Sequence, residues 1–379
     1  MSVVAKTAAL LRPRASSVTI GPIGIDFGLE SVHLVQLATS AGKAPVVHAR
    51  ASVPYECRRR EILANPHQFR TLMKRALNAD RFYGRKAVIA IPAGMFRTVS
   101  INYRSAAGKE QEAAAVLRVM KDRLDGELSD YVLDYLPVKS HSKNDERLAL
   151  VAVSEREPVI EFLELARKAR LDVEALEIGP VAITRLVSRL SMESGSDNVL
   201  VINSGRQASY LTVISGAYLM FDQEVAFGEN SLIRQAAETL DMSEDMAHDL
   251  ILRSGVQSSA YGENVAAAID EAGLVSTLSE ILKPQFLKLV EEIKRVCLYA
   301  ASETRGGAVT QVYLLGSIAH WPGSDSLLSS LMGVDVAKIL DPLALFPSAR
   351  KDDASGSGAP APEIVVATGA ALRGFPDDA

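Results

Sequence analysis

The sequence has little cysteine and no long apolar run, and each shortage excludes a class of protein. Its 379 residues include only two cysteines, Cys57 and Cys297. Two are too few for a disulfide framework or a cysteine-rich zinc site, and such a chain suits the reducing cytoplasm. No stretch of about 18 apolar residues occurs, so no segment is expected to span a membrane as a helix.

An excess of positive charge is also missing. The chain carries 41 basic and 46 acidic residues, a formal net charge of −5. Non-specific nucleic-acid binding needs a basic surface that neutralises phosphates, so nucleic acid is not an expected partner. The hydrophobic fraction of 48% and the charged fraction of 23% are those of a folded protein. The length predicts two domains or one large bilobal domain.

Two segments differ from the rest in composition. Residues 1–19 carry Lys6, Arg12 and Arg14 around an apolar stretch too short for a signal peptide. We expect a mobile tail there, and the alternative is a weak amphipathic contact with an anionic membrane surface. Residues 351–362 are rich in Gly, Ser, Ala and Pro and predict a mobile loop. The segment Ile364–Arg373 then reads as a strand passing into a small-residue helix.

One cysteine stands in an unusual setting. Cys57 is followed by three arginines, residues 58–60, and nearby cations lower the pKa of a thiol. The alternatives are an incidental surface cysteine and a reactive one.

The two halves of the chain open with similar patterns, in which a short apolar strand runs into Asp/Asn-x-Gly and two further β-rich runs follow. Asp26 begins this motif in the first half and Asn203 in the second. Asp or Asn two residues before Gly favours a hairpin. The pattern predicts two related lobes, and the alternative is two unrelated hairpins. The matching runs are Ile23–Gly28, Ser31–Leu37 and Pro45–Arg50, then Val199–Gly205, Ser209–Ile214 and Ala217–Phe221.

Helices and strands alternate through the rest of the chain, which indicates an α/β protein. Helical spacing of apolar residues predicts helices at Lys109–Leu124, from about Pro158, and at Pro284–Ala300. Strands are predicted at Lys86–Ile91, Phe96–Ile101, Val132–Val138, Leu148–Val153 and Val312–Ser317.

The order of short motifs resembles the actin-like ATPase superfold. The motifs are the two hairpin openings at Asp26 and Asn203, a Phe227-Gly228 turn, a Leu314–Ser317 turn with Pro322-Gly323 after it, and the closing Ala367–Arg373. Within that superfold the chain is most similar to the type IV pilus assembly protein PilM family, a relative of the cell-division protein FtsA. The resemblance runs from about residue 20 to residue 375.

The resemblance implies a bilobal actin-like α/β fold with an inserted subdomain in the first lobe. The first-lobe core would comprise residues 20–96 and 174–197, and the inserted subdomain would span 97–173. The second lobe would span 198–379, with a small outer subdomain at about 240–282.

In the family, ATP and its magnesium ion lie between the lobes, because tight glycine turns offer N–H groups to phosphate and aspartate holds the hydrated metal. Asp26 would hold that metal through water. The residues that the resemblance places at the nucleotide are Asp26, Gly28, Asn203, Gly205, Arg206, Gly228, Gly316 and Ser317.

Several positions depart from the family pattern, all in the same direction. Glu30 brings negative charge toward the phosphates, at a cost of about 1 kcal/mol in water and several when partly buried. His33 replaces the usual lysine and is mostly neutral at pH 7. Asn203 replaces an aspartate, Ser317 narrows the nucleoside slot, and Glu229 replaces a second glycine. We therefore expect weak or absent ATP binding and little hydrolysis, and we assign no catalytic residue.

Three functions follow from the resemblance. A PilM-like scaffold would be cytoplasmic and would bind the short cytoplasmic tail of an inner-membrane partner, PilN, in a groove between the first-lobe core and the inserted subdomain. It would reach the membrane only through that partner, and would connect it to the pilus motor ATPases. A sugar-kinase or phosphatase relative would need a catalytic aspartate, and neither Asp134 nor Asp222 is convincing. An FtsA-like filament former would end in an amphipathic helix, whereas this chain ends in an acidic segment with Pro376.

Overall fold

The computed structural model describes residues 18–40, 43–104, 109–138, 146–194, 198–216, 218–256, 268–304, 307–347 and 361–375. Most of the predicted tail (1–19) and of the predicted loop (351–362) lies outside the described residues. The predicted tail extends two residues too far, because Val18 and Thr19 belong to the first strand and pair with Ser40 and Thr39 of the second. Pro362 likewise begins a short 3-10 helix, η5 (Pro362–Ile364).

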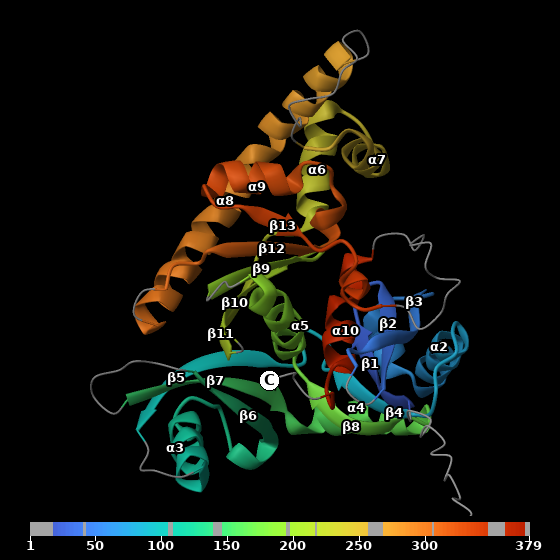
Figure 1. The fold of residues 1–379 in the computed structure, drawn as a ribbon, viewed down its shortest axis with the longest axis vertical. Helices are drawn as coiled ribbons and strands as arrows, with labels where there is room; N and C mark the ends of the chain where they lie inside the picture. The colour runs from blue at the N-terminus through green and yellow to red at the C-terminus, as the bar shows by residue number, and fades with distance from the viewer. Residues whose placement is uncertain are drawn as a thin grey trace, which may run out of the picture.

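Two five-stranded sheets have the same strand order (Figure 1). In each, three antiparallel strands are followed by two that run parallel to the first. This confirms the predicted internal repeat. The first sheet, in the order β3-β2-β1-β4-β8, contains β1 (Val18–Phe27), β2 (Ser31–Ser40), β3 (Val46–Pro54), β4 (Lys86–Ala90) and β8 (Asp172–Glu177). The second, in the order β11-β10-β9-β12-β13, contains β9 (Asn198–Ser204), β10 (Ser209–Ser215), β11 (Tyr218–Val225), β12 (Gln311–Gly316) and β13 (Val336–Lys338).

A third, smaller sheet forms a separate unit beside them (Figure 1). It has the antiparallel order β5-β7-β6, from β5 (Arg97–Arg104), β6 (Tyr131–Val138) and β7 (Glu146–Glu155). Helix α3 (Lys109–Lys121) covers one face. Alternation along the strands sends Leu148 and Leu150 to the other face, where they join the core of the second lobe.

The elements after β7 return to the first lobe. Helix α4 (Arg156–Lys168) buries Phe162 and Leu165 among the side chains of the first sheet. Strand β8 pairs parallel with β4. We therefore propose that the inserted unit ends near Glu155 instead of residue 173.

Two helices lie between the large sheets, α5 (Gly179–Ser194) and α10 (Val365–Ala371) (Figure 1). The strand predicted after residue 364 is wrong, since η5 leads directly into α10. All residues of α10 are buried, and a short helix that is apolar on every side shows no periodicity that separates it from a buried strand. Its close packing depends on glycine, because a Cβ on Gly24 of β1 would lie 2.1 Å from the carbonyl oxygen of Ala367.

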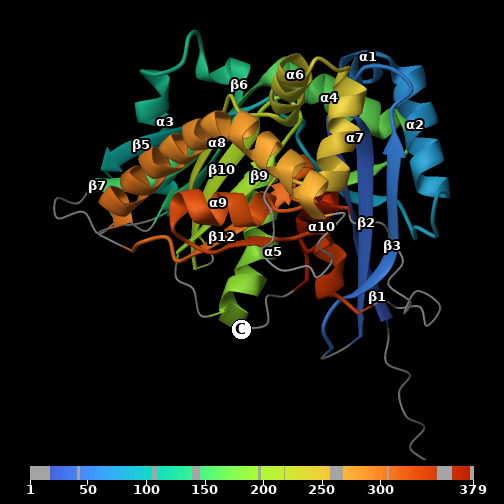
Figure 2. The same cartoon turned by 90° about the horizontal axis from the view of Figure 1, so that it is seen from above.

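The outer face of the second sheet is covered by a long helix, α8 (Ala268–Thr304), which crosses it in Figure 2. The sequence places Pro284 at the start of this helix, but it lies inside. The buried stripe of Leu278, Leu282 and Phe286 continues across the proline and accounts for the longer helix. The boundary expected at residue 282 for the outer subdomain thus falls within a helix.

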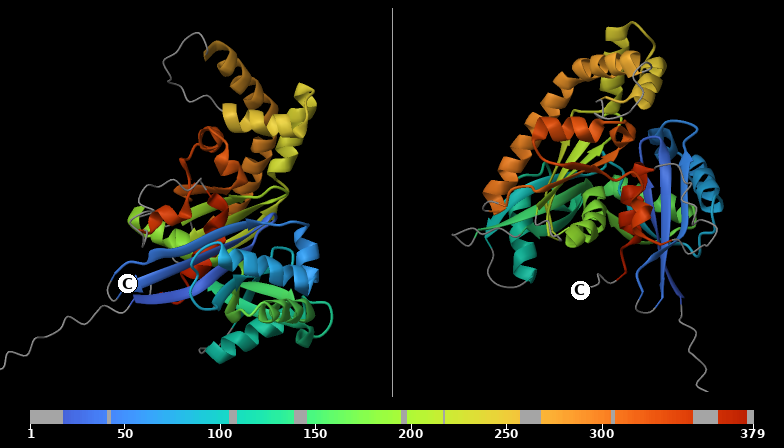
Figure 3. Two further views of the ribbon diagram at one scale, coloured as in Figure 1. Left: turned by 90° about the vertical axis from the view of Figure 1, so that its right-hand side faces the viewer. Right: turned by 45° about the horizontal axis from the view of Figure 1, so that its top comes forward.

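The remaining helices are distributed over the two lobes and the inserted unit. Helices α6 (Glu229–Leu240) and α7 (Glu244–Ser254) gather with the start of α8 at the end of the molecule away from the inserted unit (Figure 3). The others are α1 (Arg59–Ala64), α2 (Pro66–Asn78), α9 (Ser324–Met332) and the 3-10 helices η1 (Leu128–Asp130), η2 (Ser317–His320) and η3 (Pro342–Leu345). Within the described ranges, no helix has the length and apolar character needed to cross a membrane.

Candidate functional site

A cavity of about 820 Å³ lies between the two lobes. The β1–β2 turn, the β9–β10 turn, the end of β12 and the starts of α1 and α6 contribute to its lining. Seven of the eight residues predicted at a nucleotide line it, and the eighth, Gly228, packs behind the lining against the β9–β10 turn. The seven are Asp26, Gly28, Asn203, Gly205, Arg206, Gly316 and Ser317.

The glycines of the second lobe bring three backbone segments into contact. Gly316 has φ +80°, and a Cβ there would lie 1.9 Å from the carbonyl oxygen of Ser204. A Cβ on Gly228 would lie 2.5 Å from the carbonyl oxygen of Gln207. The Ser317 hydroxyl lies 3.4 Å from the Ser204 carbonyl. The end of β12 and the start of α6 therefore pack directly on the β9–β10 turn.

The first N–H groups of α6 are engaged by that turn. The backbone N–H of Glu229 donates to the Gly205 carbonyl at 3.1 Å, and that of Asn230 donates to the Arg206 carbonyl at 2.9 Å. A helix N-terminus binds phosphate through N–H groups that have no partner within the protein. Here these two donors serve the protein's own backbone.

A buried carboxylate occupies the start of α6. Glu229 is 2% exposed and accepts a hydrogen bond at 2.9 Å from the indole N–H of Trp321, which is fully buried. Arg206 Nε lies 3.7 Å from one carboxylate oxygen, and His248 Nε2 lies 3.7 Å from the other. Arg206 Nε also lies 3.1 Å from a carboxylate oxygen of Glu30, across the cleft. The sequence identifies Glu30 and Glu229 as departures from the family pattern, but it does not show that both meet at Arg206.

Asp26 lies at the end of β1, and the positive charge that acts on it is that of Arg59, which no sequence motif assigns to the cleft. Burial raises the pKa of Asp26 to about 7, and the positive charge of Arg59 only partly opposes this. Arg59 lines the cavity and donates to the carbonyls of Phe27 and Ala93, each at 3.1 Å. No local signal separates Arg59 from its arginine neighbours, because its contacts come from distant parts of the chain.

The expectation that the arginines lower the pKa of Cys57 is wrong. The pKa of this thiol is raised, first by partial burial and then by the carboxylates of Glu61 and Glu56. Arg59 turns away into the cleft, where it bonds backbone carbonyls. The reactive alternative therefore loses its physical basis.

A histidine and an aspartate in the cavity lining also have strongly shifted pKa values. Burial lowers the pKa of His33 to about 4, which favours a neutral imidazole, and its Nδ1 lies 2.9 Å from the Ser52 hydroxyl. Burial raises the pKa of Asp222 to about 7, and the Thr212 hydroxyl donates to its carboxylate at 2.7 Å.

The donor set of the cleft does not fit a magnesium nucleotide. Its carboxyl groups outnumber its arginines, and Arg206 is already paired with the carboxylates of Glu30 and Glu229, which would repel an anionic ligand. In the described part of the chain, no three His, Cys, Asp or Glu residues are grouped so as to hold a metal ion. The carboxyl groups belong to Asp26, Glu30, Asp222, Glu224, Glu229 and Glu363, and the arginines are Arg59 and Arg206. His320 also lines the cavity, and its hydrogen bond to Glu363 raises its pKa.

A second feature lies where the inserted unit meets the first lobe. Strand β6 is at the edge of its sheet, and Val132 on it is 39% exposed. Arg156, at the start of α4, donates to the carbonyls of Ser129 and Tyr131 and so joins α4 to the start of β6. Ile160 follows one turn later on the same side of α4 and is 48% exposed.

Another cavity beside the inserted unit, of about 580 Å³, lies on the side of the second lobe. It is lined by Thr98 and Ser100 of β5 together with Phe221 of β11 and Tyr299 of α8. The inserted unit therefore has an exposed strand edge beside α4 of the first lobe and a cavity beside the second lobe.

Comparison with known proteins agrees with this geometry. The sequence profile of the family described as type IV pilus assembly protein PilM matches residues 24–375. The chain belongs to the PilM family. No curated protein sequence matches it significantly.

The chain is also similar to several solved structures. The structure titled "PilM-PilN type IV pilus biogenesis complex" has 19% sequence identity and a TM-score of 0.69, over 96% of this chain and 100% of the other. The ethanolamine utilization protein EutJ of Carboxydothermus hydrogenoformans has 15% identity and a TM-score of 0.49, over 94% of this chain and 90% of the other. MreB 5 of Spiroplasma citri bound to AMPPNP has 12% identity and a TM-score of 0.46, over 85% and 92%. The predicted bilobal actin-like fold is confirmed for this PilM-family chain.

Proposed function

We propose that this PilM-family protein is a cytoplasmic scaffold of a type IV pilus or a related secretion machine. It binds the cytoplasmic tail of a PilN-like inner-membrane protein and reaches the membrane only through that partner. The family match over residues 24–375 carries the proposal. The similar structure whose title names a PilM–PilN complex supports the choice of partner. Contacts with motor ATPases would follow from such a role.

The cleft supports a scaffold more than an enzyme. Its carboxylates, its occupied helix N-terminus and its neutral His33 favour a degenerate ATP site with little or no turnover. Phosphoryl transfer needs cations and a metal positioned on the transferred group. The two arginines of the cleft already have partners within the protein.

We place the partner tail along the open edge of β6, beside α4. An extended peptide can add to an edge strand through main-chain hydrogen bonds and insert side chains into neighbouring pockets. The exposed Val132 and Ile160 supply apolar contacts at that edge. Each anchor is worth about 1.5–3 kcal/mol when buried, against about 1–2 kcal/mol per ordered backbone residue. The affinity is therefore expected to be on the order of micromolar.

Titration of a fluorescent peptide of the partner's tail against the full-length protein tests this placement. Val132→Glu and Ile160→Glu should each weaken binding by about tenfold or more, because an unpaired charge would be desolvated under the peptide. Leu117→Glu is the matched control, since Leu117 is 42% exposed on α3, which covers the other face of the same unit. Equal affinity of all four proteins would reject the β6–α4 edge, and absence of binding to the unmodified protein would reject the scaffold function.

A further inference from the structure

Three donors from separate parts of the second lobe converge on one buried carboxylate. Trp321 follows η2, Arg206 lies in the β9–β10 turn and His248 lies on α7. All three approach Glu229, whose side chain is only 3% exposed. The Trp321 indole N–H donates a hydrogen bond to this carboxylate at 2.9 Å, while Arg206 Nε and His248 Nε2 approach it at 3.7 Å, beyond hydrogen-bond distance. One hydrogen bond and a neighbouring guanidinium thus offset part of the cost of burying the carboxylate.

Such a set of donors is what a protein presents to an anionic ligand. An indole N–H and a guanidinium both recognise carboxylate and phosphate oxygens. Here the anion comes from the chain itself, at the position where the family pattern has a second glycine after Gly228. Glu229, Arg206 and His248 all line the cleft, and Trp321 lies in the core behind them, so the occupied position is at the inner wall of the cavity.

The first lobe completes the arrangement. Glu30, in the β1–β2 turn, shares the Nε of Arg206 with Glu229. Arg206 is 41% exposed and Glu30 is 58% exposed, so this outer pair is solvated while the inner carboxylate is not. The Arg206 guanidinium is thus shared between a buried carboxylate and a solvated one.

We propose that the cleft contains an anion-binding position for a carboxylate or phosphate group and that Glu229 fills it as a tethered ligand. The cleft is thus closed by the protein's own side chain. This inference rests on the proposed degenerate ATP site, but it does not depend on the partner tail. It predicts that removing one carboxylate creates a binding site for free anions.

The test uses Glu229→Gly, which restores the family's glycine, with acetate and inorganic phosphate as probes at constant ionic strength. The chain has a single tryptophan, and its indole N–H is bonded to Glu229, so its fluorescence reports the site directly. We expect Glu229→Gly to change the emission of Trp321. Acetate or phosphate should reverse that change at concentrations at least tenfold lower than any effect on the unmodified protein.

Two further variants keep the test decisive. Glu229→Gly combined with Arg206→Ala should lose the gained response, because the cation that attracts the anion is gone. Glu229→Gln preserves volume and an oxygen acceptor if the glycine variant fails to fold, and it should show no anion response. Equal anion responses in the unmodified protein and Glu229→Gly, or an unaltered response in the double variant, would overturn the tethered-ligand role. Tight MgATP binding by the unmodified protein would reject the degenerate site, whatever the glycine variant shows.

Discussion

Asp26→Asn should stabilise the protein at neutral and alkaline pH. The pKa of Asp26 is raised by burial from 3.8 to about 7, so the folded state holds its proton more tightly than the unfolded state does. Between these two pKa values the folded state binds more protons, and the stability of the unmodified protein falls as pH rises. Asparagine resembles the protonated acid in shape but does not ionise, so this loss disappears in the variant.

The magnitude follows from the size of the shift. At about 1.4 kcal/mol per pKa unit, a shift of roughly three units corresponds to about 4 kcal/mol above pH 7. The difference between variant and unmodified protein should be near zero below pH 4 and should grow by roughly 2–3 kcal/mol between pH 5 and pH 7. His33 and Asp222 also titrate, but they are present in both proteins and cancel in the comparison.

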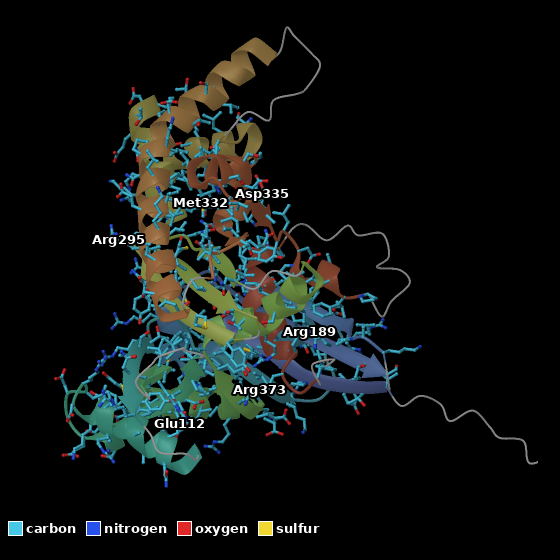
Figure 4. All side chains as sticks on the ribbon, turned by 60° about the vertical axis from the view of Figure 1, so that its left-hand side comes forward. Glu112, Arg189, Arg295, Met332, Asp335 and Arg373 are labelled. Atoms are coloured by element: carbon cyan, nitrogen blue, oxygen red, sulfur yellow. The ribbon has the colours of Figure 1, made fainter. Side chains whose placement is uncertain are left out.

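Urea unfolding of both proteins at pH 5, 6, 7 and 8 provides the measurement. Asp335→Asn is the control, because Asp335 is exposed and lies outside the cleft (Figure 4). A less stable Asp26→Asn protein at pH 8 would refute the reasoning. It would mean that attraction between the Asp26 carboxylate and Arg59 outweighs the cost of burial.

Two further predictions concern the packing that places the cleft between the lobes. Arg185→Ala should lower the free energy of unfolding by about 3 kcal/mol, because it removes two hydrogen bonds of 2.9 and 2.7 Å from the buried Glu177. The control is Arg295→Ala, which removes a surface ion pair with Glu292 (Arg295 is labelled in Figure 4) and should cost less than about 1 kcal/mol. Equal losses of the two variants in urea unfolding would contradict this prediction. Gly369→Ala should destabilise by about 1–3 kcal/mol, since its Cβ would lie 2.0 Å from a carbonyl oxygen of α5. Gly273→Ala in α8 meets no atom within 4 Å and should stabilise by up to about 1 kcal/mol, so thermal unfolding in which both alanines raise the midpoint would refute the packing argument.

Local chemistry was enough to predict the elements that repeat. Turn residues and apolar strands that are close together in the sequence predict the Asp26 and Asn203 hairpins. Each hairpin opens one of the two five-stranded sheets. The glycine turns of the cleft could also be predicted, because a tight turn needs glycine whatever surrounds it. The segment after Ile364 is a helix where a strand is predicted, since a short helix buried on every side has no polar face to show its period.

The sequence alone determined the family and the two lobes with their paired hairpin openings. Only the tertiary structure decided how the cleft is filled. Arg59 and Trp321 carry no motif, and Glu229 appears in the sequence only as a missing glycine. The hydrogen bond between Trp321 and Glu229 joins residues 92 positions apart. Such contacts depend on how helices and turns pack, and local propensity contains no information about that packing.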